Sequence, residues 1–309
     1  MSLPHTIPGV WPASIPSSRF ASLIRRELPD LAPPGAVALL GLPDDLGVRL
    51  NNGRPGAALA PAALRDALAR YAVASPGGWS WPPTFDAGDI TPAAGNDAAS
   101  LDATHQRITA ATRMLLERGY FPIAIGGGHD LTLPFARAAI LHHRAHGRDV
   151  KGCVYFDAHL DVRPTHGSGM SFRRLIEDCA ISRLYIHGFS DLANSAEHLT
   201  WFRQHGGITR DDPAGVAEGR WKPDCPYIAS FDLDVIDAAH IPGVSAINPA
   251  GWSVRDAARW VSRLARDPGC VCFDLMELSP PNDPTGRSAR VAAHLLLTFL
   301  QGFSQRGGT

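Results

Sequence analysis

The sequence contains very little lysine and no segment long enough to anchor it in a membrane. Only Lys151 and Lys222 are lysines among its 309 residues, and arginine supplies nearly all of the positive charge. The 29 basic and 30 acidic residues leave a formal net charge of -1, which argues against a nucleic-acid-binding protein. No apolar run reaches the roughly 18 residues that a membrane-spanning helix needs. We therefore expect no nucleic-acid partner and no membrane association.

The N-terminus and the cysteines give no sign of secretion. The opening segment MSLPHTIPGVWPASIPSS lacks a basic head followed by a long apolar stretch, so it does not resemble a signal peptide. The odd number of cysteines, five, argues against a disulfide scaffold in a chain of this length. No C-x-x-C pair occurs, which argues against a zinc site built from thiolates. These features favour a cytoplasmic protein.

Short apolar runs alternate with helical segments from residue 36 onward. The runs predict buried strands at 36–43, 120–128, 151–159, 183–189, 226–234 and 270–277. Helical spacing lies between them, at 61–73, 101–119, 131–145, 171–180, 194–206, 253–267 and 287–303. Such alternation is typical of βαβ units, in which helices cover both faces of a parallel sheet. We predict one α/β domain over 36–309, preceded by a Pro-rich arm over 1–35.

Acidic residues and histidines cluster where the predicted strands end. The motif DAHLD (157–161) places three such side chains two residues apart, so they point to one side of an extended chain. The motif DLD (232–234) repeats this arrangement after another strand, and GGGHD (126–130) follows a third. Ligands of open parallel sheets bind at this edge. The candidate ligand residues are His129, Asp157, His159, Asp161, Asp232 and Asp234.

Four carboxylates that converge without a cation would repel one another and raise their pKa values. Together with two imidazoles, they match two divalent cations that share carboxylates. A ligand set of nitrogen and oxygen favours Mn²⁺, although Zn²⁺, Fe²⁺, Co²⁺ and Ni²⁺ are chemically compatible. Taken alone, each motif also has a structural explanation as helix caps and salt bridges. All three motifs at strand ends favour the metal site.

As a set, these motifs resemble those of the arginase–agmatinase–formimidoylglutamase superfamily of binuclear manganese hydrolases. The motifs that carry the resemblance are GGGHD (126–130), DAHLD (157–161), SFDLDVID (230–237), PGVSA (242–246) and DLMELSPPND (274–283). The resemblance extends from about residue 36 to residue 303. It implies a three-layer α/β/α sandwich around a central, mostly parallel sheet. It also implies a homo-oligomer, a trimer or a hexamer.

The resemblance further implies two Mn²⁺ ions per subunit, bridged by Asp157 and Asp232. The first ion would also bind His129 and Asp161, and the second His159 and Asp234. A hydroxide between the ions would attack the trigonal carbon of an amidine or guanidine. Asp161 would accept its proton and pass it to the leaving nitrogen, and Glu277 would pair with the cationic edge of the substrate.

The loops resemble most closely those of the formimidoylglutamase branch. The segment LGVRLNNGRPGA (46–57) matches its loop before the first helix. In DVRPTHGSGMSFRRL (161–175), Ser168 stands where guanidino hydrolases usually have a histidine. Formimidoylglutamate carries two carboxylates, which Arg163 and Arg173 could bind. The implied reaction converts N-formimidoyl-L-glutamate and water to L-glutamate and formamide, a step of histidine breakdown.

Two alternatives stay open at this point. The first is a guanidino hydrolase of the agmatinase, guanidinobutyrase or arginase type, which releases urea; His166 would then take the place of the missing histidine. The second is an inactive regulatory member of the superfamily. The six intact ligand positions argue against the inactive member, because ligands that no longer serve catalysis are free to change.

Overall fold

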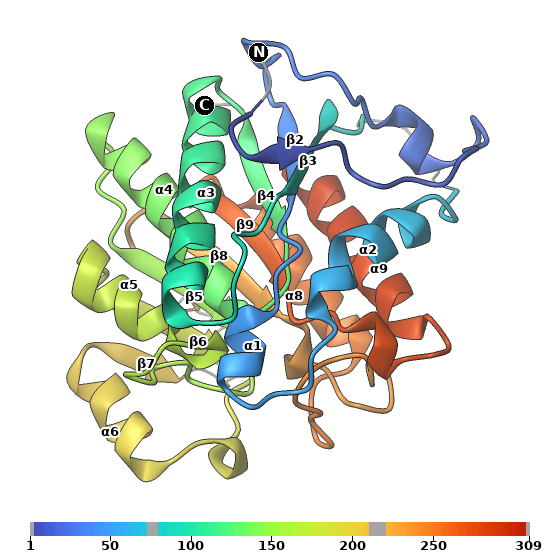
Figure 1. Cartoon of the computed structure of the whole chain (residues 1–309). Coiled ribbons are helices and arrows are strands. Elements are labelled where there is room, and N and C mark those ends of the chain that lie inside the picture. The colour runs from blue at the N-terminus through green and yellow to red at the C-terminus, as the bar shows by residue number, and fades with distance from the viewer. Residues whose placement is uncertain (1–2, 73–79, 210–220, 307–309) are drawn as a thin grey trace.

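The computed structural model describes residues 3–72, 80–209 and 221–306 (Figure 1). The strands are β1 (Thr6–Ile7), β2 (Val37–Gly41), β3 (Thr84–Ile90), β4 (Phe121–Ile125), β5 (Gly152–Phe156), β6 (Arg183–His187), β7 (Gly207–Thr209), β8 (Tyr227–Asp232) and β9 (Cys270–Met276). The α-helices are α1 (Leu46–Leu50), α2 (Ala60–Leu68), α3 (Ala98–Glu117), α4 (Thr132–Ala145), α5 (Ser171–Cys179), α6 (Ala196–Gln204), α8 (Val254–Arg266) and α9 (Arg287–Phe303).

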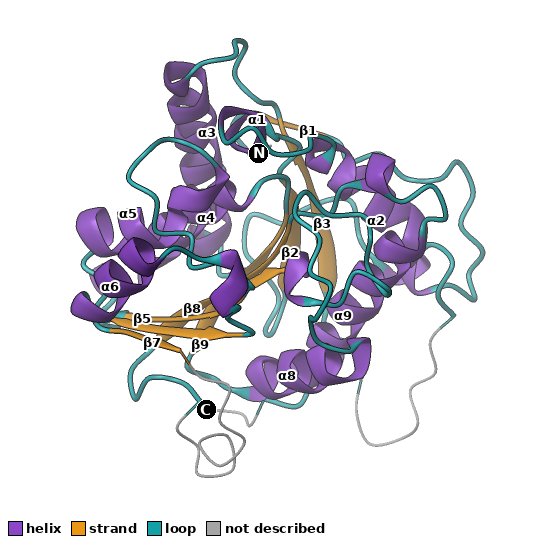
Figure 2. Ribbon diagram, turned by 90° about the horizontal axis from the view of Figure 1, so that it is seen from below, coloured by secondary structure: helices purple, strands orange, loops and turns teal. Residues whose placement is uncertain are grey.

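The strands of the described residues form one nine-stranded sheet in the order β1-β3-β2-β4-β9-β8-β5-β6-β7. Every neighbouring pair is parallel except β1 and β3. Helices α3, α4 and α5 cover one face, and α2, α8 and α9 cover the other (Figure 2). The predicted three-layer α/β/α fold is confirmed. Among the described residues, no helix is long and apolar enough to cross a membrane.

A hydrophobic core fills the space between each face of the sheet and the helices that cover it. On one face Ile108, Phe135 and Leu175 bring α3, α4 and α5 against the strands. On the other face Leu64 and Leu296 bring α2 and α9 against them. The strands of a sheet covered in this way are apolar on both sides, which explains why most of them were recognisable as continuous apolar runs.

Strand β3 escaped prediction because it carries buried charge. Its sequence, TFDAGDI, contains two aspartates and a glycine instead of an apolar run. The guanidinium of Arg65 on α2 binds Asp86 at 2.8 Å and Asp89 at 2.6 Å, and all three side chains are almost fully buried. A buried charge is tolerated when it is paired in this way. The pairing, which decides that this segment is a strand, joins distant parts of the chain.

The N-terminal segment contributes to the sheet and to a core. Residues Thr6–Ile7 pair with β3 at the edge of the sheet. Phe20 and Ile24 are buried in the same core as α2 and α9. The indole of Trp11 donates a hydrogen bond to Asp86. Residues 3–35 are thus held to the α/β unit by strand pairing, by core packing and by a hydrogen bond to the buried ion pair of β3.

Candidate active site

The predicted ligand residues lie at the ends of strands in the middle of the sheet. His129 follows the glycine turn after β4, Asp157 follows β5, Asp232 ends β8 and Glu277 follows β9. These four strands are neighbours in the order β4-β9-β8-β5. Because parallel strands all end at the same edge, residues far apart in sequence meet there.

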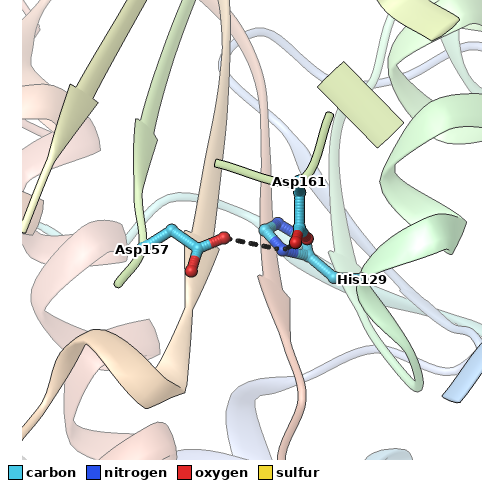
Figure 3. Close-up of side chains that lie close together, drawn as sticks. All are labelled: His129, Asp157 and Asp161. Atoms are coloured by element: carbon cyan, nitrogen blue, oxygen red, sulfur yellow. Dashed lines mark ion pairs between the residues drawn. The ribbon is translucent and has the colours of Figure 1, made fainter. Parts of the chain in front are cut away.

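Three carboxylates surround one ring nitrogen of His129. The Nδ1 atom lies 3.1 Å from Asp157 Oδ2, 2.9 Å from Asp161 Oδ2 and 3.1 Å from Asp232 Oδ2. Figure 3 shows Asp157 and Asp161 approaching the ring from two sides. This group has the composition of the first predicted ion's ligand set.

The other ring nitrogen of His129 determines what faces those carboxylates. Its Nε2 atom lies 2.9 Å from Ser230 Oγ, and that hydroxyl donates to Asp274 Oδ1 at 2.5 Å. Since the serine has given its only proton to Asp274, it accepts from the Nε2 proton of His129. The Nδ1 atom is therefore the one that faces the three carboxylates, and it carries either a second proton or a bound cation. Such an arrangement requires a positive charge between them.

A second group forms around His159, which is 30% exposed at the side chain and opens to the cavity. Its Nδ1 atom lies 3.0 Å from Asp234 Oδ2 and 3.4 Å from Asp157 Oδ1. Asp157 thus turns Oδ2 toward His129 and Oδ1 toward His159. A carboxylate that offers one oxygen to each group has the geometry of a bridging ligand.

The pKa shifts of these groups all indicate that the cluster has too little positive charge for its carboxylates. Burial and the charges of Asp161 and Asp234 raise the pKa of Asp157 to about 6. Burial and the charges of Asp234 and Asp157 also raise the pKa of Asp232 well above its usual value. The charge of Asp234 raises the pKa of His159, although burial opposes it. Contacts with the three carboxylates outweigh burial and raise the pKa of His129.

Several buried ligand atoms also lack a hydrogen-bond partner among the described residues. They are His129 Nδ1, Asp157 Oδ2 and Asp234 Oδ1. Buried polar atoms are almost always paired in folded proteins, so their ordinary partner here is a bound cation. Nitrogen and oxygen donors without sulfur suit divalent ions such as Mn²⁺. The residues present therefore fit a pair of divalent cations.

Glu277 lies directly beside this cluster. One of its two carboxylate oxygens has a hydrogen-bond partner among the described residues, and the other has none. Its backbone has a left-handed conformation, with φ of 67°, which turns the side chain back under the glycine turn. Its Oε1 atom accepts the backbone N–H of His129 at 2.8 Å, whereas Oε2 has no partner among the described residues. Burial raises the pKa of Glu277 to about 8, and a cation beside it would reverse that shift.

A cavity of about 160 Å³ opens above the cluster. The predicted substrate residues Arg163 and Ser168 both line it. Ser168 Oγ accepts a hydrogen bond from Asn51 Nδ2 at 3.1 Å, which joins the segments 46–57 and 161–175. These two segments were the ones whose sequences suggested the substrate branch.

Two other residues considered from the sequence do not reach this cavity. Arg173 on α5 binds Glu177 at 2.8 Å and lies over the ring of Trp201, 4.6 Å from its centroid. His166 faces Asp102 on α3 at 3.5 Å. Neither residue lines the cavity, because helix α5 and the loop before it direct these side chains outward. Arg173 is thus placed outside the proposed substrate site.

The structure adds cavity residues that the sequence did not single out, namely Asn51, Asn194, His198 and Ser245. The amide of Asn194 accepts the N–H of Leu160 at 2.9 Å and donates to Ala158 O at 2.8 Å. It therefore shapes the ligand loop and is not free to bind a substrate. For Asn194, the only signal in the sequence was the Asn-Ser pair at 194–195, at the start of the helix predicted over 194–206.

Comparison with known proteins identifies the family. The model of the Arginase family matches residues 35–301. Formimidoylglutamase of Aromatoleum aromaticum is 37% identical, over 89% of this chain and 85% of that protein. Formimidoylglutamase of Ralstonia nicotianae is 33% identical and covers 97% of both chains.

Solved structures agree with this. Trypanosoma cruzi formiminoglutamase with Mn²⁺ is 30% identical, with a TM-score of 0.82 over 95% of this chain and all of that one. Proclavaminate amidino hydrolase from Streptomyces clavuligerus, 24% identical over 96% of this chain and 99% of that one, shares the fold with a TM-score of 0.79. Since the family model spans most of the residues and the strand-end motifs lie within it, this chain belongs to the arginase family.

Proposed function

We propose that this protein is a formimidoylglutamase, which hydrolyses N-formimidoyl-L-glutamate to L-glutamate and formamide. The observation that carries the proposal is the division of charge in the cavity. The carboxylates that line it are Asp161, Asp232, Asp234 and Glu277, and all of them belong to the group around His129 and His159. The other described lining residues include Arg163 and His198 and no carboxylate.

This division matches formimidoylglutamate better than agmatine or arginine, whereas 4-guanidinobutyrate, with its anionic tail, is distinguished by the substrate panel. Formimidoylglutamate has a cationic amidine at one end and two carboxylates at the other, so its tail needs cationic or neutral donors. Agmatine and arginine carry a cationic amine in the tail, which would call for an acidic partner there. His166, the one candidate for the histidine of the guanidino branch, lies against Asp102. The formimidoylglutamase relatives support the same choice.

The metal cluster supplies the reactive end of the proposed site. We assign two Mn²⁺ ions to the groups around His129 and His159, with Asp157 and Asp232 shared. Asp161 would complete the ligand set around His129, and Asp234 would complete the set around His159. When bound, such a pair neutralises the carboxylates and lowers the pKa of water toward neutrality, which provides a nucleophile.

The remaining roles fall to two carboxylates of the chain. Asp161 is the ligand carboxylate on a loop beside the cavity, where it can hold a proton from water and deliver it to the leaving nitrogen. Glu277 Oε2 is free to pair with the amidinium N–H groups. In the net reaction, water adds its oxygen to the amidine carbon and the carbon–nitrogen bond to glutamate breaks. A proton moves to the leaving nitrogen.

A substrate panel on manganese-loaded protein tests the function. Formimidoylglutamate, agmatine, arginine and 4-guanidinobutyrate would be compared, with formamide, glutamate and urea measured separately. We expect formamide and glutamate in equal amounts and no urea. Urea from any guanidino compound, with no formamide, would place the protein in the other branch.

The binuclear assignment has its own test. Elemental analysis after manganese loading should approach two ions per chain, and Asp232→Ala should lose both metal and turnover. Asp237→Ala, which changes a nearby aspartate outside the proposed ligand set, is the matched control and should retain two ions. Full activity with a single tightly bound ion would contradict the assignment.

Two further expectations belong to this proposal. A homo-oligomer, trimeric or hexameric, follows from the family resemblance, and light scattering on the purified protein would measure its mass. We also propose a cytoplasmic location, and fractionation of the source cells would test it.

A further inference from the structure

We propose that His198 binds the α-carboxylate of the substrate and thereby sets its specificity, an inference that rests on the proposed function. His198 lies in the first turn of α6 and lines the cavity. Its backbone N–H is capped by Ser195 Oγ at 3.1 Å. Its side chain is half-buried, and no hydrogen bond or ion pair joins its ring to another described residue.

The other polar groups around the cavity are largely committed. The amide of Asn194 is used by the backbone of the ligand loop, at Leu160 N and Ala158 O. Asn51 donates to Ser168. The Arg163 guanidinium and the His198 ring are therefore nitrogen donors left for an anionic tail, and the hydroxyls of Ser168 and Ser245, which accept bonds from Asn51 and Arg54, also keep a proton to donate. We assign one carboxylate of formimidoylglutamate to each of Arg163 and His198.

Position decides which carboxylate each one takes. Asn194 ties the start of α6 to the loop that carries His159 and Asp161, so His198 is held rigidly with respect to the metal cluster. Arg163 is an exposed residue with a long side chain, suited to the outer part of the ligand. The α-carboxylate is three bonds from the reacting carbon and the distal carboxylate five. We therefore assign the nearer one to His198.

The local field also favours an anion at this place. The first turn of a helix has free backbone N–H groups and the positive end of the helix dipole. An imidazole N–H adds a directed donor, which either tautomer provides. His198 stands in the first turn of α6 and lines the cavity, so its ring N–H and the helix N-terminus would both attract a carboxylate.

The test removes each carboxylate in turn. N-formimidoyl-4-aminobutyrate lacks the α-carboxylate, and N-formimidoyl-2-aminobutyrate lacks the distal one. His198→Ala should raise KM roughly 10- to 100-fold for formimidoylglutamate and for the 2-aminobutyrate derivative, with kcat nearly unchanged. It should not change KM for the 4-aminobutyrate derivative, which has already lost the contact. Arg163→Ala should give the reverse pattern.

His205→Ala provides the matched control, because that residue ends the same helix and bonds to Trp201 O instead of facing the cavity. It should leave all three KM values unchanged. Equal effects of His198→Ala on both analogues, or an effect on neither, would overturn the assignment.

Calorimetric titration with L-glutamate, the expected product, provides a readout that does not depend on turnover. Weaker binding to His198→Ala supports the proposal, whereas unchanged binding overturns it. If the wild-type protein binds glutamate but releases urea from a guanidino compound, the proposed function is contradicted. The titration of His198→Ala with glutamate would then still test whether His198 binds a carboxylate.

Discussion

Arg54 holds Ser245 at the cavity wall through both its backbone and its side chain. The N–H of Arg54 donates to Ser245 Oγ at 3.0 Å, and its Nε atom donates to Ser245 O at 2.8 Å. A third bond runs from Nη2 to Val244 O at 2.7 Å. The motif GRPGA (53–57) therefore positions PGVSA (242–246), although almost two hundred residues separate them.

Arg54→Ala should loosen this wall without disturbing the metals. We expect KM to rise severalfold, with kcat and manganese content retained, because the guanidinium contacts only loop carbonyls. Arg54→Lys should restore little, since an ammonium cannot reach both carbonyls with the planar geometry of a guanidinium. Steady-state kinetics with metal analysis checks this, and a fall in metal content would show that Arg54 acts on the cluster itself.

Ser230→Ala should weaken metal binding although Ser230 is not a proposed ligand. The change leaves the Nε2 proton of His129 without its acceptor and removes the hydroxyl donor from Asp274. Loss of such a partner typically costs 10- to 100-fold in metal affinity. Competition with a manganese chelator would measure it. Thr132→Val removes a 3.3 Å contact to the same hydroxyl and a hydrogen bond to Asp274, but it leaves the acceptor of His129 Nε2 in place and should have a smaller effect.

Glu277→Gln should separate substrate binding from metal binding. Glutamine can still accept the N–H of His129, so the fold of the turn and the metal content should persist. The lost charge-assisted pair is worth about 1.5–3 kcal/mol, so kcat/KM should fall more than tenfold. Unchanged kinetics would return Glu277 to a purely structural role in the turn.

Asp283 provides a pH-dependent prediction on stability. Although burial opposes it, hydrogen bonds from Ser288 and Thr285 lower the pKa of Asp283 to about 2. A depressed folded pKa stabilises the protein above the ordinary carboxyl value, and that stabilisation is lost as pH falls through about 2. Asp283→Ala should therefore cost about 1–2 kcal/mol near pH 7.

The difference in unfolding free energy between wild type and Asp283→Ala should shrink toward zero between pH 4 and pH 2. Urea titrations across that range would measure it. Asp97→Ala provides a comparison, because hydrogen bonds from Ser100 at the start of α3 also lower the pKa of Asp97, so its effect should likewise disappear at low pH. A difference that is independent of pH would mean that Asp283 acts through packing and not through its charge.

Local spacing was sufficient to identify most strands and the residues that gather around His129 and His159. In DAHLD (157–161) and DLD (232–234), side chains two residues apart follow an apolar run, and that period is a property of the extended chain itself. The alternation of runs and helices determined the parallel sheet in the same way. Strand β3 lacked such a signal, because it carries Asp86 and Asp89, whose burial involves ion pairs with Arg65 on another element.

Tertiary structure alone decided which residues meet. The sheet order makes β4, β9, β8 and β5 neighbours, and this brings His129 Nδ1 within about 3 Å of three carboxylates. Local periodicity carries no information about which strands pair. Nor does it specify that a loop turns Arg163 into the cavity while α5 directs Arg173 toward Trp201. Long side chains reach several neighbours, so the packing around them, and not their position in the chain, determines what they contact.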